Sequence, residues 1–517
     1  MDHHYSIGRM LEYWSQERPD SPGIAVEGVA AHTFGEWYRH SSRLANGFAV
    51  LVPDSATIRG VGFAGKSAVS WGVVLAAASL VKATATPLNW RLSRREMQEI
   101  VADANLDAIV VEAEFMPQFG YPVPEDGRTR LLVPDAQPQD FENWLAQFSE
   151  EPVTPAAGPD DIALMVYTSG TSGRPKGVQL SNRAIAANLA SNPPWQIHPG
   201  DVVMVPAPNF HISGTGWIFY CLGLGAGSHH VLDVRPELVL PVLAGGAVNH
   251  ALTVPAVVQM LVEHESARRS TYPELRTLIY GGSPMSPTVA SVAQDVFGCD
   301  LMQAYGMTET CGPITILDAE DHRGGGGLLL ASAGRPVRGV EMGVFDPVTG
   351  ERVSVGATGE VWTRSEMLLT GYHNQPDELA AVLSGDGWFR TGDAGYLDED
   401  GYLFLCDRVK DMIVSGGENV YPVEVENVLM AHPAVRDAAV IAVPHERWGE
   451  TVKAVIVPTR EGLDVSDVIS YCRQHLAHYK CPTSVDIVAE LPRNPSGKLL
   501  KRELRRPYWA QHERGIA

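Results

Sequence analysis

Residues 168–177 carry the chemical groups that a polyphosphate needs. They read Thr-Ser-Gly-Thr-Ser-Gly-Arg-Pro-Lys-Gly and follow the apolar run Leu-Met-Val-Tyr. We expect a flexible loop whose backbone N–H and hydroxyl donors wrap phosphate oxygens. Lys176 adds a positive charge, and Pro175 restricts the backbone just before it. The order Gly-Arg-Pro-Lys-Gly excludes a Walker A motif, which ends in Gly-Lys-Ser/Thr, and leaves a plain polar turn as the alternative.

Two carboxylates further along the chain have the chemistry to complete a nucleotide site. Glu309 ends the segment 303–309, in which Tyr305 offers an aromatic face to a base and Thr308 a hydroxyl to a phosphate. Carboxylate oxygens suit Mg²⁺, which proteins bind through one or two carboxylates together with substrate phosphates. Asp393, in the order Trp-Phe-Arg-Thr-Gly-Asp, can accept from both hydroxyls of a ribose. Taken alone, Glu309 would equally suit a solvated surface carboxylate.

These segments resemble, in their order along the chain, the motifs of the adenylate-forming superfamily of acyl-CoA synthetases, peptide-synthetase adenylation domains and firefly luciferase. After the phosphate loop, the matching segments are 280–284, 303–309, 388–393, 407–412 and 492–498. The resemblance therefore covers nearly the whole chain. It implies an enzyme that activates a carboxylic acid with ATP and Mg²⁺ and passes the acyl group to a thiol.

The resemblance also assigns roles to single residues of the nucleotide site. It places ATP or AMP against Thr168, Ser169, Gly170, Thr171, Ser172, Lys176, Gly281, Gly282, Ser283, Gln303, Ala304, Tyr305, Gly306, Met307, Asp393 and Arg408. Lys498 resembles the catalytic lysine, although a lysine near a C-terminus is usually just solvated. Thr308 would contact the α-phosphate, Glu309 would hold Mg²⁺, and Lys410 occupies the hinge position.

The acid and the thiol are indicated by weaker signals. Ser415, Gly416, Gly417 and Glu418 resemble a segment that lines the tunnel for CoA, and they equally suit a turn before a helix. Phe210, His211, Ile212 and Trp217 resemble the gate and wall of an acyl pocket. His211 would act in gating and catalysis, with a satisfied interior histidine as the alternative. Trp217 and its neighbours could equally be core.

These assignments predict an ATP-dependent carboxylate–CoA ligase. The acid would become acyl-AMP with release of pyrophosphate, and the C-terminal domain would rotate before transfer to CoA. The segment 209–220 has no Asp to pair with an α-amino group, which favours a hydrophobic acid over an amino acid. Three alternatives stay open: a carrier-protein pantetheine as acceptor, a relative that performs a single half-reaction, and a non-catalytic nucleotide-binding scaffold.

Strand and helix patterns alternate through the first 400 residues or so, as in layered α/β proteins with largely parallel sheets. We expect a large N-terminal domain over residues 1–407, including a β-rich subdomain, a hinge at 408–411 and a small mobile α+β domain over 412–517. Strands are predicted at 108–111, 164–168, 359–364, 371–372, 401–406, 438–443 and 452–457. Helices are predicted at 183–190, 238–243, 255–264, 423–430 and 465–475. The glycines at 324–327 predict a surface loop.

Composition limits the possible partners. The 517 residues carry a net charge of −21, which disfavours nucleic acid and anionic membranes because both attract positive patches. Six cysteines without a C-x-x-C pair suggest free thiols in a reducing compartment. The N-terminus lacks the pattern of a signal peptide, and no long uncharged apolar run appears. We therefore expect a cytoplasmic protein without stable membrane insertion, and a homodimer is compatible with the sequence.

Overall fold

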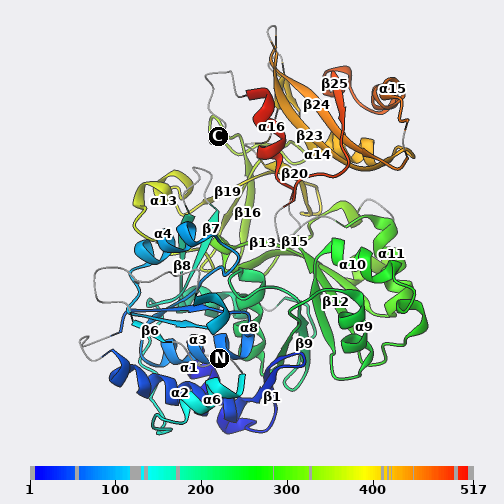
Figure 1. Cartoon of the computed structure of the whole chain (residues 1–517). Coiled ribbons are helices and arrows are strands. Elements are labelled where there is room, and N and C mark those ends of the chain that lie inside the picture. Colours follow the sequence, from blue (N-terminus) through cyan, green and yellow to red (C-terminus); the bar gives the residue numbers. More distant parts are fainter. Residues whose placement is uncertain are drawn as a thin grey trace. The chain divides into compact units, whose positions relative to one another are not determined.

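The computed structural model describes most of the chain (Figure 1). The described residues are 6–52, 58–116, 130–132, 138–169, 175–191, 193–282, 285–324, 329–408, 411, 413–415, 418–420, 422–445, 448–460, 462–493 and 499–509. The chain forms two compact units. The first comprises Met1–Glu341 and Arg364–Phe389, and the second comprises Met342–Thr363 and Arg390–Ala517.

One sheet of the first unit is seven-stranded, in the order β18-β8-β7-β4-β3-β5-β6. Its strands are β3 (Gly60–Ala64), β4 (Thr84–Pro87), β5 (Ala108–Val111), β6 (Arg130–Leu132), β7 (Ile162–Ser169), β8 (Pro175–Ser181) and β18 (Gly371–Tyr372). The strands from β7 to β6 pair in parallel, whereas β7, β8 and β18 pair antiparallel. Strand β5 is buried along its length, as an apolar run in a parallel sheet should be.

The other sheet of this unit is nine-stranded, in the order β15-β14-β13-β12-β11-β9-β10-β1-β2. Its strands are β1 (Pro22–Val26), β2 (Ala30–Thr33), β9 (Val202–Val205), β10 (Gly227–His230), β11 (His250–Thr253), β12 (Thr277–Gly281), β13 (Asp300–Met307), β14 (Gly312–Leu317) and β15 (Arg335–Pro336). The pairs from β1 to β13 are parallel, and the two ends of the sheet are antiparallel.

Helices cover these two sheets (Figure 1). They are α1 (Ile7–Glu17), α2 (Phe34–Leu51), α3 (Ala68–Leu80), α4 (Arg94–Ala104), α6 (Pro138–Leu145), α7 (Asn182–Ala190), α8 (Ile212–Leu224), α9 (Pro236–Ala244), α10 (Pro255–Glu263), α11 (Pro287–Phe297), α12 (Ala319–Gly324) and α13 (Pro376–Val382), with 3₁₀ turns η1 (Ala113–Phe115), η2 (Ala267–Arg269), η3 (Thr308–Thr310) and η4 (Leu329–Ala331). Helix α3 contacts strands of both sheets and is buried on every face, which explains why its sequence is apolar all round.

Capping side chains mark where several helices begin. Thr33 and Glu36 form a capping box at the start of α2, and Ser93 and Glu96 form another at the start of α4. In each box the hydroxyl and the carboxylate satisfy backbone N–H groups that the first helical turn leaves unpaired. The sequence therefore sets these helix starts locally.

The second unit is built around two further sheets. A four-stranded sheet contains β16 (Glu341–Phe345), β17 (Gly359–Arg364), β19 (Phe389–Leu397) and β20 (Leu403–Arg408). A five-stranded sheet contains β21 (Ile413–Ser415), β22 (Glu418–Val420), β23 (Val435–His445), β24 (Gly449–Pro458) and β25 (Ser484–Ile487). The helices are α14 (Pro422–Met430), α15 (Val465–His475) and α16 (Lys501–Trp509), with the 3₁₀ turn η6 (His478–Lys480).

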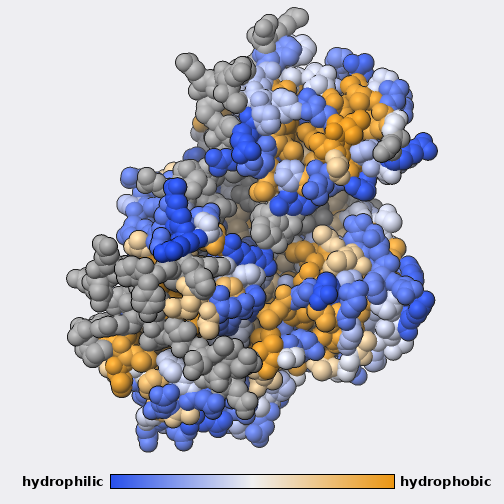
Figure 2. Space-filling model, viewed as in Figure 1, coloured by the Kyte–Doolittle hydropathy of each residue, from blue (hydrophilic) through white to orange (hydrophobic). Residues whose placement is uncertain are grey.

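The second unit has apolar side chains on its surface. Figure 2 shows hydrophobic residues on the face of the unit that is in view. Its exposed large apolar side chains include Met430, Ile487 and Leu500.

Many predicted elements are confirmed, and the α/β fold class with them. The predicted strands at 108–111, 359–364 and 371–372 and the predicted helix at 465–475 have the observed bounds. Strands β19 and β20 pair with each other. Residues 342–363 and 390–407 belong to the same unit as the C-terminal part, whereas residues 364–389, which include β18, belong to the first unit. The hinge at 408–411 stays a prediction.

Three further expectations concern the glycine loop at 324–327, the cysteines and the absence of a membrane-spanning segment. Gly324 ends α12, and the other three glycines of the predicted loop lie outside the described residues. The six cysteines are unpaired, and five of them are buried. Within the described part of the chain, no helix combines the length and the apolar character that crossing a bilayer requires.

Candidate active site

The two ends of the predicted phosphate loop lie opposite each other in an antiparallel hairpin. Thr168 at the end of β7 is the register partner of Lys176 in β8, and Ser169 is that of Pro175. The expectation of a flexible loop over all of residues 168–177 is therefore wrong at both ends, where strand pairing holds the backbone. Pro175 is tolerated because it opens its strand. Gly170, Thr171 and Ser172 lie outside the described residues, as does the side chain of Ser169.

Lys176 projects from β8 into a largely buried environment. Its side chain is 10% exposed, and its Nζ donates to Oε2 of Glu378 at 2.5 Å. The same Nζ lies 5.0 Å from the centre of the Tyr372 ring, a cation–π contact. Strand β18 pairs with β8 and so places Tyr372 beside the lysine, while Glu378 comes from α13.

Tyr372 connects Lys176 to the predicted metal ligand. Its Oη donates to Oε1 of Glu309 at 3.2 Å. Burial, followed by the negative charge of Glu309, raises the pKa of Tyr372, so the phenol stays a neutral donor. The backbone of Glu309 is held as well, because its carbonyl accepts from the N–H of Leu369 at 2.7 Å. Glu309, Tyr372, Lys176 and Glu378 thus form one contiguous polar cluster.

Two of the segments predicted to contact ATP or AMP run side by side. Gly281 in β12 is the register partner of Ala304 in the parallel strand β13. A Cβ at Gly281 would come within 2.6 Å of the carbonyl oxygen of Ala304, and one at Gly306 would come within 2.0 Å of the carbonyl oxygen of Gly312. Close backbone contact between strands therefore requires both glycines. Gly282 follows with φ +79°, and Ser283 lies outside the described residues.

Residues 303–308 divide between the interior and the carboxyl end of β13. Gln303 is buried and accepts from Oη of Tyr280 at 3.3 Å, within a network that includes His322. Thr308 begins the 3₁₀ turn η3 and is also buried. Tyr305 and Met307 are half-buried, close to the end of the strand. The carboxyl ends of parallel strands are where ligands bind in open α/β sheets.

Asp393 and Arg408 belong to the second unit. They are register partners on the antiparallel strands β19 and β20. Asp393 is 9% exposed, and its backbone N–H donates to Oγ1 of Thr391 at 3.0 Å. These two predicted nucleotide contacts are therefore paired across one ladder, although the side chain of Arg408 lies outside the described residues.

The predicted acyl-pocket residues lie at the start of α8. His211 is exposed, and its Nδ1 accepts from the N–H of Ser213 at 3.1 Å, which caps the helix. The alternative of a satisfied interior histidine is therefore wrong. The ring of Phe210 meets that of Trp90, with centroids 6.0 Å apart. Trp217 is 8% exposed and packs on Trp195.

Other residues of that helix belong to the core. Ile212 is 8% exposed, and Ile218 and Phe219 are almost fully buried. For Ile218 and Phe219, neighbours of Trp217, the sequence was compatible with either a pocket wall or the core. Their burial favours the core.

The predicted CoA segment forms a hairpin in the second unit. Ser415 at the end of β21 is the register partner of Glu418 at the start of β22, and α14 follows. Gly416 and Gly417 lie outside the described residues, and so does the side chain of Glu418. The hinge residue Lys410 and the catalytic candidate Lys498 also lie outside them.

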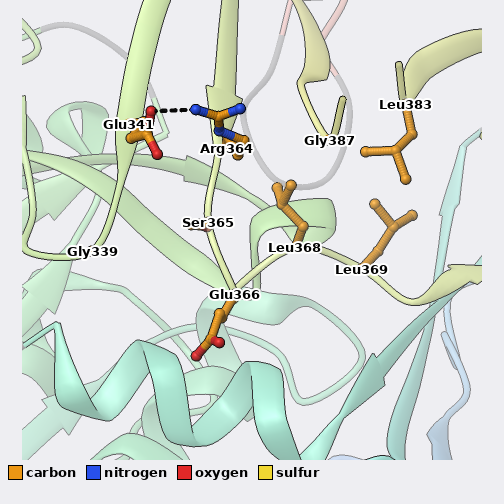
Figure 3. A pocket seen from close by; sticks show the side chains of 9 residues that line it. All are labelled: Gly339, Glu341, Arg364, Ser365, Glu366, Leu368, Leu369, Leu383 and Gly387. Atoms are coloured by element: carbon orange, nitrogen blue, oxygen red, sulfur yellow. Dashed lines mark hydrogen bonds and ion pairs between the residues drawn. The ribbon is translucent and has the colours of Figure 1, made fainter. Parts of the chain in front are cut away.

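A separate open pocket of about 550 Å³ lies elsewhere on the first unit (Figure 3). Figure 3 shows Leu368, Leu369 and Leu383 on one side and the ion pair of Glu341 with Arg364, 2.7 Å long, on another. No residue that the sequence analysis assigned to a site is among the described residues that line it. This pocket is therefore not evidence for the acyl pocket.

Tyr372 and Glu378 were missed by the sequence analysis. The β-type run at 371–372 was recognised as a strand, but nothing in it indicates a partner. Glu378 lies 202 positions along the chain from Lys176, and Tyr372 lies 63 from Glu309. Both contacts depend on the pairing of β18 with β8 and on the packing of α13 against β18 and of η3 against β8, which the sequence does not show locally.

Comparison with known proteins shows the family of the chain. The model of the AMP-binding enzyme family matches residues 11–373, and that of the AMP-binding enzyme C-terminal domain matches residues 424–498. The chain therefore belongs to the AMP-binding enzyme family. Within the adenylate-forming superfamily it is an acid–thiol ligase of the acyl-CoA synthetase class, which forms AMP.

Relatives of this class are similar over nearly the full length. A fatty acid–[acyl-carrier-protein] ligase, ScoC, of Streptomyces coeruleorubidus is 34% identical over 529 residues, covering 99% of each chain. A feruloyl-CoA synthase of an Amycolatopsis species is 35% identical, covering 93% of this chain and 95% of its own. The crystal structure of ATP-bound MatB from Rhodopseudomonas palustris, 28% identical, superposes with a TM-score of 0.87 over 97% of this chain and 99% of its own.

Proposed function

We propose that the protein activates a hydrophobic carboxylic acid as acyl-AMP with ATP and then transfers the acyl group to CoA. The observation that carries the proposal is the cluster in which Tyr372 lies between Lys176 and Glu309. A buried cation close to a carboxylate suits a polyphosphate that arrives with a divalent metal ion.

Two observations support Glu309 as the residue that would bind Mg²⁺. Its Oε1 accepts from Tyr372, which orients the carboxylate, and its carbonyl is held by Leu369. Mg²⁺ bound there would neutralise negative charge on the phosphates. A ligand oriented by a hydrogen bond from a neighbouring side chain is usual at metal sites.

The first half-reaction can be written with this chain's residues. A carboxylate oxygen of the acid bonds to the α-phosphorus of ATP as the bond to the bridging β-phosphate oxygen breaks, and pyrophosphate leaves. Lys176 would hold the β- and γ-phosphates, Thr308 would donate to the α-phosphate, and Lys498 would neutralise charge between the two anions. Asp393 and Arg408 would hold the ribose.

The second half-reaction needs a thiol at the acyl carbon. The sulfur bonds to that carbon, the carbon–oxygen bond to AMP breaks, and the thiol proton is released. We propose that rotation of residues 412–517 about Lys410 withdraws Lys498 and brings Ser415, Gly416, Gly417 and Glu418 to the pantetheine. His211 at the head of α8 would gate the entry.

The nature of the acid is supported by the residues around Phe210 and by the relatives. Trp90 and Phe210 are apolar aromatic surfaces, and the segment 209–220 lacks an Asp for an α-amino group. The relatives are named for a fatty acid and for an aromatic acid. An acyl or aryl acid without an amino group is therefore the substrate class that we propose.

Two further possibilities concern the thiol that accepts the acyl group and the number of half-reactions that the protein performs. ScoC is named for an acyl-carrier protein as acceptor, and this favours testing carrier pantetheine beside CoA. A relative that performs a single half-reaction is also compatible with the residues present. A cytoplasmic location and a homodimer stay predictions.

Pyrophosphate exchange tests the proposal. The whole chain would be assayed for ATP–[³²P]pyrophosphate exchange with a panel of fatty, aromatic and polycyclic acids, and then for thioester with CoA and with a phosphopantetheinylated carrier. We expect exchange with at least one hydrophobic acid and thioester with CoA. Exchange without thioester would assign adenylation alone, and thioester from supplied acyl-AMP without exchange would assign the second step alone.

A further inference from the structure

Two imidazoles and a carboxylate lie close together at the edge of the nine-stranded sheet. They are His32 of β2, His40 of α2 and Glu142 of α6, and one donor atom from each lies within 4.8 Å of the other two. Nε2 of His32 is 2.9 Å from Oε1 of Glu142, and the two imidazole rings meet edge to face with centroids 4.5 Å apart. Nothing in the proposed reaction uses these side chains.

Local sequence brings two of the three together. Strand β2 ends at Thr33, which caps α2, so the chain turns directly from the strand into the helix. His32 therefore precedes the cap, and His40 lies two turns into the helix. Helix α6 packs against α2 and supplies Glu142. Figure 1 shows α2 and α6 next to each other, at the end of the first unit away from β8 and α13.

The two imidazoles are buried while the carboxylate has access to solvent. His32 is 4% exposed and His40 is 7% exposed, whereas the Glu142 side chain is 44% exposed. Among the residues that the structure describes, Nδ1 of His32 and Nδ1 of His40 have no hydrogen-bond partner. Buried polar nitrogens usually have one, because an unsatisfied group loses its hydration without compensation.

We propose that His32, His40 and Glu142 form a binding site for one divalent transition-metal ion of the Zn²⁺ type. Two imidazoles and one carboxylate, with a fourth position for water, is a usual zinc ligand set. Tetrahedral ligands at about 2.0–2.2 Å from the ion lie roughly 3.3 Å from each other. The donor atoms here lie within 4.8 Å of one another, so they must move closer together to bind one ion, and the partly exposed Glu142 side chain can shift to allow this.

The chemistry of the ligands separates this site from the one at Glu309. Imidazole nitrogen suits Zn²⁺, Ni²⁺ and Cu²⁺, whereas Mg²⁺ prefers oxygen ligands. The charged groups that act on His40 are His32, Glu142, Arg39 and Arg43, and Glu36 interacts with His32. Arg43 is paired with Glu150 at 2.6 Å. A metal ion here would join the edge strand to two helices, so its effect would be on stability rather than on the reaction.

Metal titration of the whole chain tests the site. The protein would be stripped with a chelator, dialysed, and titrated with ZnCl₂ by calorimetry, with thermal unfolding measured in parallel. We expect one Zn²⁺ per chain and a rise in melting temperature that MgCl₂ does not reproduce. Substitution with Co²⁺ should give the visible absorption of a four-coordinate ion.

Variants decide whether these three residues are the ligands. His40→Gln and Glu142→Gln should each weaken Zn²⁺ binding at least tenfold and remove the zinc-dependent stabilisation. His229→Ala is the matched control, because it removes an imidazole that meets a carboxylate, Oε2 of Glu27 at 2.7 Å from Nε2, outside the proposed set of ligands. Glu142 is partly exposed, so its variant tests the site even if that of His40 does not fold. Absence of zinc-dependent stabilisation in the parent, or an unchanged response in Glu142→Gln, would overturn the proposal.

Discussion

The ammonium of Lys176 lies 2.5 Å from a carboxylate oxygen of Glu378. The lysine lies near the start of β8, within the segment 168–177 that was predicted to bind phosphate, and the glutamate comes from α13. If Lys176 holds the phosphates of ATP, the nucleotide must compete with Glu378 for this cation. The ion pair thus places an anion that opposes ATP binding next to the cation that favours it.

Removing that anion should strengthen ATP binding. In Glu378→Gln we expect the KM for ATP to fall about fivefold, since a partly exposed ion pair is worth roughly 1 kcal/mol. Pyrophosphate exchange at varied ATP measures it. Glu366→Gln is the control, because Glu366 is an exposed carboxylate of the same unit at the open pocket of Figure 3. A raised KM in Glu378→Gln would mean that Glu378 positions Lys176 instead.

The hydroxyl of Tyr372 should matter for Mg²⁺. Tyr372→Phe keeps the ring beside Lys176 but removes the hydrogen bond to Glu309, so the carboxylate is less well oriented. We expect half-maximal exchange to need about three- to tenfold more Mg²⁺, the equivalent of one ordinary hydrogen bond. Tyr272→Phe, which removes a hydroxyl bonded to the carbonyl of Ala267 in the core, should leave the Mg²⁺ dependence unchanged. Equal effects of the two variants would contradict the assignment of Glu309.

Lys498 should act in the first half-reaction and not in the second. Lys498→Ala removes a charge that would stabilise the joining of two anions, so pyrophosphate exchange should fall about 100-fold or more. Thioester formation from supplied acyl-AMP should be nearly unchanged, because pyrophosphate has already left. Quenched-flow measurement of each half-reaction checks this. Adenylation at the normal rate in the variant would exclude the assigned role.

Buried histidines should make the fold sensitive to acid. Burial, followed by the nearby His229, lowers the pKa of His230 to about 3 from 6.5, and burial lowers that of His250 to about 4. Between these pH values and 6.5 the unfolded chain binds more protons than the folded chain. The free energy of unfolding therefore falls as the pH decreases, by up to about 1.4 kcal/mol per pH unit for each such histidine.

His230→Leu tests this pH dependence. Both ring nitrogens of His230 lack a hydrogen-bond partner within the described ranges, so leucine removes a buried polar ring and its proton linkage together. We expect the variant to gain stability relative to the parent, and to gain more at pH 5 than at pH 8. Thermal unfolding at both values measures it. The same change at pH 5 and pH 8 would show that His230 is not a source of the acid sensitivity.

Local elements were largely predictable from the sequence. The helix at 465–475 and the strands at 359–364 and 371–372 were predicted with the observed bounds, because apolar periodicity and turn residues act over short distances. The loop predicted at 168–177 was too long. Its glycines and hydroxyls suggested a turn throughout, whereas the pairing of β7 with β8 makes both of its ends part of strands. The nucleotide contact predicted for Gly281 stays a prediction, and the close approach of the Ala304 carbonyl, which requires a glycine there, could be recognised only from the strand register.

The sequence by itself determined the chemistry that this protein can perform. The order of its motifs resembles that of the adenylate-forming superfamily and so predicted a nucleotide-dependent ligase, a class that the family match confirms. This was possible because charge and hydrogen-bonding capacity belong to the residue and not to its place in the fold. Only the tertiary structure decided which side chains meet. Tyr372 lies near Lys176 because β18 pairs with β8, a strand far away in the chain. Helix α13, which carries Glu378, packs against β18, and the turn η3, which carries Glu309, packs against β8. Such long-range packing leaves no local signal in the sequence.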